Sequence, residues 1–245
     1  QTNAKRPLSP GGFDSRKSNR GNHISRDGNF VAYVAHPQDG DGELVVRDIQ
    51  SGKEWRAPRG YRPAVPRPNS FDPAAVRAFA AQGRLLRPIF SADSKFLFFA
   101  IEPTRAEIRK AKRAKKKSKD FPKKGLGIMN LASGEVTKID RVKTFRVPED
   151  GTGFVAYLKE PSNQGKNTAP KANATAQKRK KKKRYGSDLV LRKLADGSER
   201  TFPDVLTYSI SKDAKLLVYA VSSRQQETNG AFALIPGSEA APVAL

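Results

Sequence analysis

The chain of 245 residues contains no cysteine, one methionine, one tryptophan and two histidines. Without cysteine, neither a disulfide framework nor a thiolate metal site can form. His23 and His36 have no second histidine or glutamate at metal-ligand spacing, so the sequence predicts no metal site at either. No apolar run approaches the roughly 18 residues that a membrane-spanning helix needs, and we expect no membrane span.

The sequence also lacks the short motifs that mark common active sites and cofactor sites. There is no G-x-S-x-G, no P-loop, no H-E-x-x-H and no G-x-G-x-x-G. We therefore expect no catalytic residue and no cofactor in this chain. The carboxylates of Asp39, Asp41 and Glu43 alternate with glycines, and turn formation explains this composition better than calcium, which takes roughly six to eight oxygen ligands.

What the chain does contain is a pattern that occurs four times, an aspartate that opens a turn followed by an apolar strand. The aspartates are Asp27, Asp93, Asp150 and Asp213. The apolar strands that follow them are expected at 30–34, 96–100, 154–158 and 216–220. Self-similarity with a period of about 40 to 50 residues, once insertions are removed, is typical of β-propeller blades.

A second apolar strand returns in each copy, at 44–49, 126–131, 189–194 and 232–235. A glycine turn follows each of these strands, at Gly52, Gly134, Gly197 and Gly237. Glycine supplies the positive φ that a tight turn requires. The sequence therefore predicts an all-β fold, a β-propeller of about four four-stranded antiparallel blades that forms a partial or open propeller. Aromatic residues in the strands are interpreted as packing between blades.

The expected organisation is an irregular lead-in over residues 1–22 and a propeller over 23–245. The blades are expected at about 23–55, 86–139, 142–202 and 205–245, with insertions at 56–85, 104–124 and 164–184. In the first insertion, Asp72, Pro73 and Gly83 are helix start and stop signals that predict a short helix at 72–83. The abundance of Ala, Glu, Lys and Arg predicts a charged helix at 104–119.

The formal net charge of +23 is concentrated in two of these insertions. Residues 104–124 contain eleven Lys or Arg and two acids, and residues 164–184 contain nine Lys or Arg and no acid. Each therefore has a net charge of +9, which leaves +5 for the rest of the chain. Both insertions occupy the same place in their blades, so we expect them to emerge on the same face.

These insertions are candidate contacts for a polyanion such as nucleic acid or an acidic envelope polymer. The residues are Lys115, Lys116, Lys117, Arg179, Lys180, Lys181, Lys182, Lys183 and Arg184. The alternative is a solvated loop whose charge keeps it extended. No stacking aromatic residue lies in the second run before Tyr185, although such residues are usual in readers of single-stranded nucleic acid.

Several stretches resemble the N-terminal propeller of secreted serine peptidases of the prolyl oligopeptidase family. They cover nearly the whole chain and include 27–33, 37–47, 54–60, 90–94, 122–129, 141–142, 155–158 and 185–189. The family pattern has a Trp where this chain has Arg16. The resemblance implies a secreted or periplasmic protein, and a downstream α/β-hydrolase domain that holds the catalytic Ser, Asp and His. The propeller would then act on peptide substrates only indirectly.

Two functions follow from these features. In the first, the chain is a non-catalytic propeller segment of a prolyl oligopeptidase family serine peptidase that gates substrate access or mediates protein contacts. In the second, it is a stand-alone propeller module whose paired basic loops bind a polyanion. Four blades fit both an open arc of a larger ring and a small closed propeller.

Overall fold

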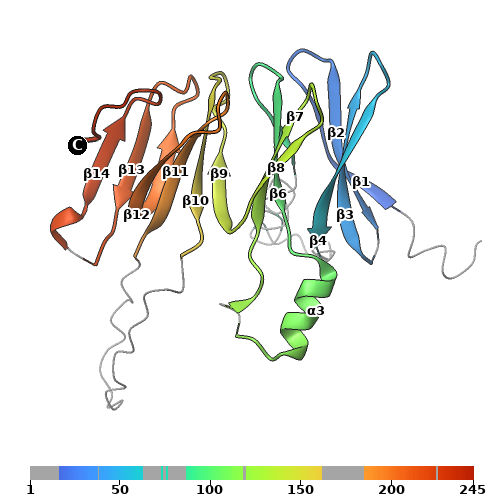
Figure 1. Cartoon of the computed structure of the whole chain (residues 1–245), viewed down its shortest axis with the longest axis horizontal. Helices are drawn as coiled ribbons and strands as arrows, with labels where there is room; N and C mark the ends of the chain where they lie inside the picture. The colour runs from blue at the N-terminus through green and yellow to red at the C-terminus, as the bar shows by residue number, and fades with distance from the viewer. Residues whose placement is uncertain are drawn as a thin grey trace, which may run out of the picture. The chain divides into compact units, whose positions relative to one another are not determined.

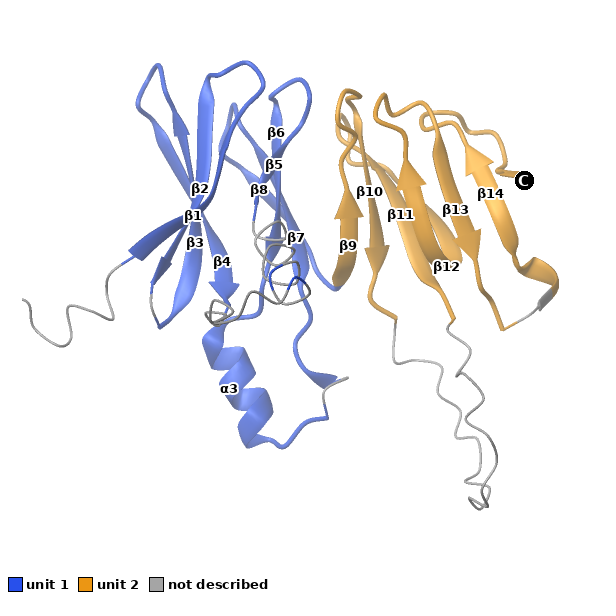
Figure 2. Ribbon diagram, turned by 180° about the vertical axis from the view of Figure 1, so that it is seen from behind, with its two compact units in different colours: residues 1–141 blue, residues 142–245 orange. Residues whose placement is uncertain are grey.

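The computed structural model describes residues 17–37, 39–62, 73, 76, 87–117, 120–161, 185–224 and 226–245. They form antiparallel sheets and the helix α3 (Arg105–Arg113), in two compact units, residues 1–141 and 142–245 (Figures 1 and 2). Neighbouring strands in every sheet are consecutive in the chain, so each sheet is an antiparallel meander. The predicted all-β fold of four-stranded propeller blades is confirmed.

Unit 1 contains two four-stranded sheets. The first consists of β1 (Lys17–Ile24), β2 (Phe30–Pro37), β3 (Asp41–Asp48) and β4 (Glu54–Tyr61). The second consists of β5 (Ile89–Phe90), β6 (Phe96–Ile101), β7 (Gly125–Asn130) and β8 (Val136–Ile139). Since alternate residues of a strand point to opposite faces, one face of each sheet supplies the shared core, with Val34 and Leu44 packed in the same cluster as Leu97, Phe99 and Met129.

Unit 2 is a continuous seven-stranded sheet in which one strand serves two blades. Its strands are β9 (Val142–Arg146), β10 (Phe154–Lys159), β11 (Ser187–Lys193), β12 (Glu199–Ile210), β13 (Leu217–Val221), β14 (Gly230–Leu234) and β15 (Val243–Ala244), with a short 3-10 helix at Gln226–Thr228. The first part of β12 pairs with β11 and the second with β13. The change occurs at Val205, which pairs with both Ser187 and Val221, beside a register shift on each side.

Two expected boundaries differ from the structure. The lead-in is not irregular over 17–22, because β1 begins at Lys17 and pairs with β2. As an edge strand, β1 pairs with a neighbour on one side only. Its residues are mostly polar, so it has no apolar periodicity from which a strand could be predicted. The expected insertion 56–85 begins with strand, because β4 extends to Tyr61. Pro58 signalled a loop, but proline is tolerated on an edge strand.

The charged helix predicted at 104–119 is present but shorter. It begins after the capping residue Thr104 and ends at Arg113, and Lys115 then adopts a positive φ of 48° that a right-handed helix cannot continue. Of the helix predicted at 72–83, only Pro73 and Val76 lie within the described residues, and both are helical. The whole insertion 164–184 lies outside the described residues.

The repeated aspartate turns share one hydrogen-bond pattern in three of the four copies. In the first blade the Ser25 hydroxyl donates to Asp27 (2.5 Å) and accepts the N–H of Phe30 (2.9 Å). Ser91 and Asp93 repeat this arrangement at 2.6 Å, and so do Ser211 and Asp213 at 2.6 Å. Each serine thus joins the start of the turn to the first residues of the apolar strand.

The turn at Asp150 departs from this pattern because Pro148 stands where the other copies have serine. The N–H groups of Asp150 and Gly151 donate instead to the carbonyl of Lys212, both at 2.8 Å. The Lys212 ammonium also pairs with Glu149 at 2.8 Å. The third turn is therefore held by the fourth, within unit 2.

Candidate functional site

Helix α3 belongs to unit 1, where it is inserted between β6 and β7 and extends past the ends of these strands (Figure 1). A capping box fixes its first turn, in which Thr104 and Glu107 each satisfy a backbone N–H of the other. The N–H of Arg105 donates to the Asp41 carboxylate at 2.8 Å. The Arg105 guanidinium pairs with Asp39 and lies over the ring of Tyr61. Contacts from the first sheet therefore anchor the start of a helix that belongs to the second.

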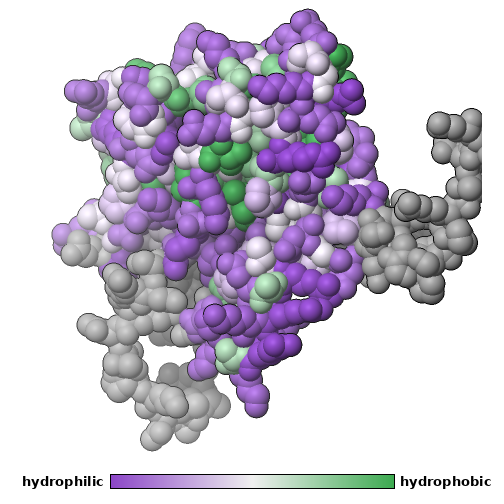
Figure 3. Space-filling view, turned by 45° about the vertical axis from the view of Figure 1, so that its right-hand side comes forward, coloured by the Kyte–Doolittle hydropathy of each residue, from purple (hydrophilic) through white to green (hydrophobic). Residues whose placement is uncertain are grey.

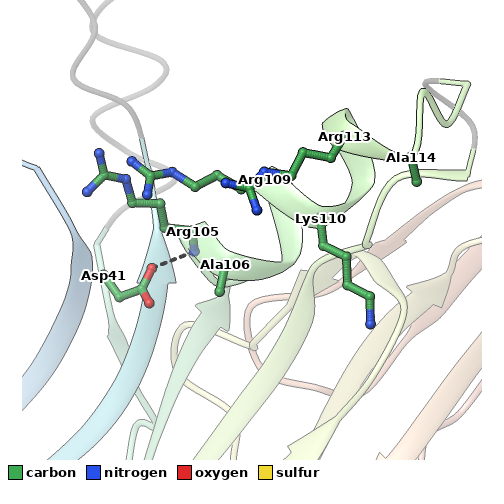
Figure 4. Close-up of a pocket in the computed structure, with 7 residues that line it drawn as sticks. All are labelled: Asp41, Arg105, Ala106, Arg109, Lys110, Arg113 and Ala114. Atoms are coloured by element: carbon green, nitrogen blue, oxygen red, sulfur yellow. Dashed lines mark hydrogen bonds between the residues drawn. The ribbon is translucent and has the colours of Figure 1, made fainter.

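An open hollow lies along α3 (Figure 4). Its lining residues are Asp41, Arg105, Ala106, Arg109, Lys110, Arg113 and Ala114. Because residues four apart lie on the same face of a helix, Arg105, Arg109 and Arg113 form one row, which we call the arginine row. Their side chains extend in the same direction, toward the start of the helix, while Lys110 points away from them (Figure 4).

The positive charge of this segment is largely uncompensated. Residues 104–117 contain eight Lys or Arg and one acid, a net charge of +7. Among the described residues, Arg105 has an acidic partner at salt-bridge distance, whereas Arg109, Lys110 and Arg113 have none. Like charges four residues apart destabilise a helix by about 0.2 to 0.5 kcal/mol per pair. The cap and the buried Ala111, 2% exposed, stabilise α3 against this repulsion.

A second charged cluster lies at the base of the same insertion. Glu102, which precedes the helix, pairs with Lys124 at 3.2 Å and with Arg62 at 3.7 Å. Arg59 is only 2% exposed. Burial lowers its pKa to about 10, and the nearby Glu102 carboxylate opposes that shift. The Glu102–Lys124 pair joins the two ends of the insertion, and the Glu102 N–H donates to the Arg59 carbonyl of β4 at 2.8 Å, so the cluster is structural.

The sequence-predicted polyanion contacts fall into two groups. Lys115, Lys116 and Lys117 are exposed and follow the last turn of α3, outside the lining of the hollow. The second group, residues 179–184, lies outside the described residues. The two insertions belong to different units, so their expected emergence on the same face stays a prediction.

The histidines and turn carboxylates that we considered as ligands make ordinary structural contacts. The Nδ1 of His23 contacts the Pro88 carbonyl at 2.9 Å, and the Nδ1 of His36 contacts the Pro37 carbonyl at 2.8 Å. Glu43 pairs with Arg56 at 2.9 Å, just as Asp39 and Asp41 contact Arg105. Within the described residues, no three His, Cys, Asp or Glu side chains cluster in a way that would hold a metal ion.

One face of the molecular surface can be judged by its hydropathy. The face in Figure 3 is mostly hydrophilic, with hydrophobic atoms gathered in small areas between polar ones. No helix in the described part of the chain is long and apolar enough to cross a membrane.

Two features of the structure were missed from the sequence. The arginine row was visible as arginines at positions i, i+4 and i+8, but the lysines between and after them favoured an interpretation by net charge rather than by spacing. The serine two positions before three of the turn aspartates was also visible. Serine is common in turns, so its repetition, not its identity, was the signal.

No protein-family model and no curated protein matches the chain. Solved structures that it resembles include one of two prolyl endopeptidases studied for inter-domain dynamics, at 14% identity and a TM-score of 0.48. The others include an acylaminoacyl peptidase from Pyrococcus horikoshii (9%, 0.46) and the β-propeller domain of the Trilobed protease from Pyrococcus furiosus (10%, 0.46). The matches cover 97%, 94% and 95% of this chain, but 30%, 32% and 58% of those chains.

Proposed function

We propose that this chain is a non-catalytic propeller segment of a prolyl oligopeptidase family serine peptidase, and that it gates substrate access or mediates protein contacts. The observation that carries the proposal is the repeated blade, with its Ser–Asp turns, in stretches whose sequence resembles that family's propeller. In this proposal the catalytic Ser, Asp and His belong to a downstream α/β-hydrolase domain, and the protein is secreted or periplasmic.

Helix α3 is the element that we assign to protein contacts. It is held at its base by Asp39, Asp41 and the Glu102 cluster, so it is a fixed projection of unit 1. Its arginine row is directed to solvent and to the hollow rather than to the blade core. A rigid projection with unpaired charge is suited to recognising a partner of opposite charge.

The parent protein in the source cells tests this proposal. An antibody against this chain should detect a polypeptide larger than 26.9 kDa that a fluorophosphonate probe labels at a serine. Cell fractionation should place that polypeptide in the secreted or periplasmic fraction. A 26.9 kDa polypeptide without the label would contradict the proposal.

The second candidate is a polyanion-binding module, which the net charge of +7 over residues 104–117 favours. Binding to nucleic acid would release counterions and weaken steeply with added salt. Deletion of residues 178–184 should then reduce binding of a duplex DNA probe, measured by fluorescence anisotropy at several salt concentrations. Equal binding before and after the deletion would reject a role for that basic run.

A further inference from the structure

We infer that the arginine row of α3 binds an acidic segment of a polypeptide in extended conformation. The inference deepens the proposed function by naming the chemistry of the partner, and it rests on the protein-contact role proposed above. Three observations carry it: which arginines are free to pair, how far apart they lie, and which other groups line the hollow.

The first observation is that the members of the arginine row differ in their contacts. Arg105 is held by Asp39 and lies over Tyr61, with 5.8 Å between its guanidinium carbon and the ring centroid. Arg109 and Arg113 have no acidic partner among the described residues, and both line the hollow. Arg105 therefore fixes one end of the row, while the other two arginines offer planar guanidinium forks that suit carboxylates.

The second observation is spacing. A helix rises about 1.5 Å per residue, so Arg109 and Arg113 lie about 6 Å apart along the axis. An extended polypeptide advances about 3.3 Å per residue and places alternate side chains on one face, about 6.6 Å apart. Two carboxylates on alternate residues of an extended segment can therefore meet the two arginines together.

The third observation separates a polypeptide from nucleic acid. Asp41 lies among the lining residues, at the end of the hollow where the helix begins (Figure 4). Nucleic acid presents a closely spaced series of negative charges, about one per 1.7 Å of duplex axis, and an aspartate on its path repels it. A polypeptide carries N–H donors between its acidic side chains, and Asp41 can accept a hydrogen bond from one of them.

Fluorescence anisotropy with the full chain tests the inference, with a labelled peptide of alternating Glu and Ser as the probe. The unmodified chain should bind this peptide more tightly than an oligothymidylate of equal charge. The charge reversal Arg109→Glu with Arg113→Glu should weaken peptide binding about tenfold or more, since it removes two exposed ion pairs and adds repulsion.

The matched control is Lys116→Glu with Lys117→Glu, which changes the net charge equally but lies outside the lining of the hollow. It should weaken peptide binding less than about threefold, by loss of long-range attraction alone. The milder pair Arg109→Gln with Arg113→Gln guards against loss of the helix, which circular dichroism would detect. It should still weaken binding by several-fold, with the helix retained.

Three outcomes overturn the inference. Equal losses in the arginine and lysine variants would show that net charge, not the row, attracts the peptide. Tighter binding of the oligothymidylate through the same arginines would assign the row to nucleic acid. No peptide binding by the unmodified chain would remove the site. None of these outcomes affects the antibody and fluorophosphonate test, so this inference and the proposed function fail separately.

Discussion

A single serine hydroxyl organises each of three blade turns. Ser91 is 2% exposed, donates to Asp93 at 2.6 Å, and accepts the N–H groups of Lys95 at 3.2 Å and Phe96 at 3.0 Å. The aspartates of these turns were predicted from the sequence, because they recur at the same place in the repeat. Their serine partners were not predicted, because serine is common in turns and only its repetition two positions before three of the aspartates marks it out.

Substitution Ser91→Ala should lower the free energy of unfolding by about 1 to 3 kcal/mol, because it removes the acceptor of the part-buried Phe96 N–H and the hydroxyl donor of Asp93. The measurement is urea denaturation followed by circular dichroism. Ser133→Ala is the matched control, since the Ser133 hydroxyl is exposed and accepts one N–H, from Glu135. The control should cost less than about 0.5 kcal/mol. Equal effects of the two substitutions would contradict this account of the turns.

Turn aspartates should also shape stability at acid pH. The Ser211 hydroxyl and the Lys215 N–H hold the pKa of Asp213 below its ordinary value of 3.8, and the N–H of Ser198 lowers the pKa of Asp196 to about 2. A carboxyl whose pKa is lower in the folded state stabilises the fold above pH 3.8, and this contribution is lost as pH falls toward the folded pKa.

The urea midpoint should therefore fall between about pH 4 and pH 2, and Asp196→Asn should make this fall shallower. Asp188→Asn is the control, because it removes a carboxyl from a strand rather than from a turn. If the midpoint depends on pH equally in the unmodified chain and in the Asp196→Asn variant, this turn does not contribute to the loss of stability at acid pH.

At the scale of elements, the strands that are short, nearly continuous apolar runs were predicted and the polar edge strand was not. Predicted apolar segments overlap eight strands, because a short apolar run bounded by turn signals is typical of a buried strand; the strands are β2, β3, β6, β7, β10, β11, β13 and β14. The outer strands of the blades were not located, because they carry more polar residues and are held largely by backbone pairing; they are β1, the end of β4, β5, β8, β9, β12 and β15. Helix α3 was predicted from composition, but its end depends on the backbone conformation of Lys115.

The pair of β6 and β7 depends on a glycine beneath an aromatic ring. Gly127 pairs with Phe99, and a Cβ at Gly127 would lie 2.4 Å from the phenyl ring. Gly127→Ala should therefore cost about 1 to 3 kcal/mol of unfolding free energy by overpacking. Combined with Phe99→Leu, it should cost at least about 0.5 kcal/mol less than the sum of the single changes, because the smaller side chain relieves the clash. Additive costs in denaturation would contradict direct contact.

The attachment of the α3 insertion depends on one carboxylate among several cations. Glu102→Gln should cost on the order of 2 kcal/mol, because the buried Arg59 loses its attraction to a negative charge, although solvent screens the half-exposed Lys124. Glu135→Gln, an exposed change in the turn between β7 and β8, should cost less than about 0.5 kcal/mol. Thermal unfolding that is equal for both variants would show that the cluster does not hold the insertion.

For the whole molecule, composition and repeats were enough to predict the fold class, but they were not enough to predict the candidate site. Burial of apolar strand faces acts along the entire chain, so it leaves a strong pattern in the sequence. The arginine row depends on which face one short helix turns toward solvent. It also depends on Asp39 and Asp41, which are far from it in sequence. The net charge predicted an anionic partner, but only the geometry of α3 favours an acidic polypeptide over nucleic acid.

The central proposal is that this chain is a propeller segment without catalytic activity of its own. Its most direct test is to incubate the purified 245-residue chain with a fluorophosphonate probe and a fluorogenic proline-containing peptide, beside an active peptidase of the prolyl oligopeptidase family. We predict no covalent label on the chain and no hydrolysis, while the active peptidase shows both. A labelled serine, together with hydrolysis that disappears when that serine is replaced by alanine, would contradict the claim.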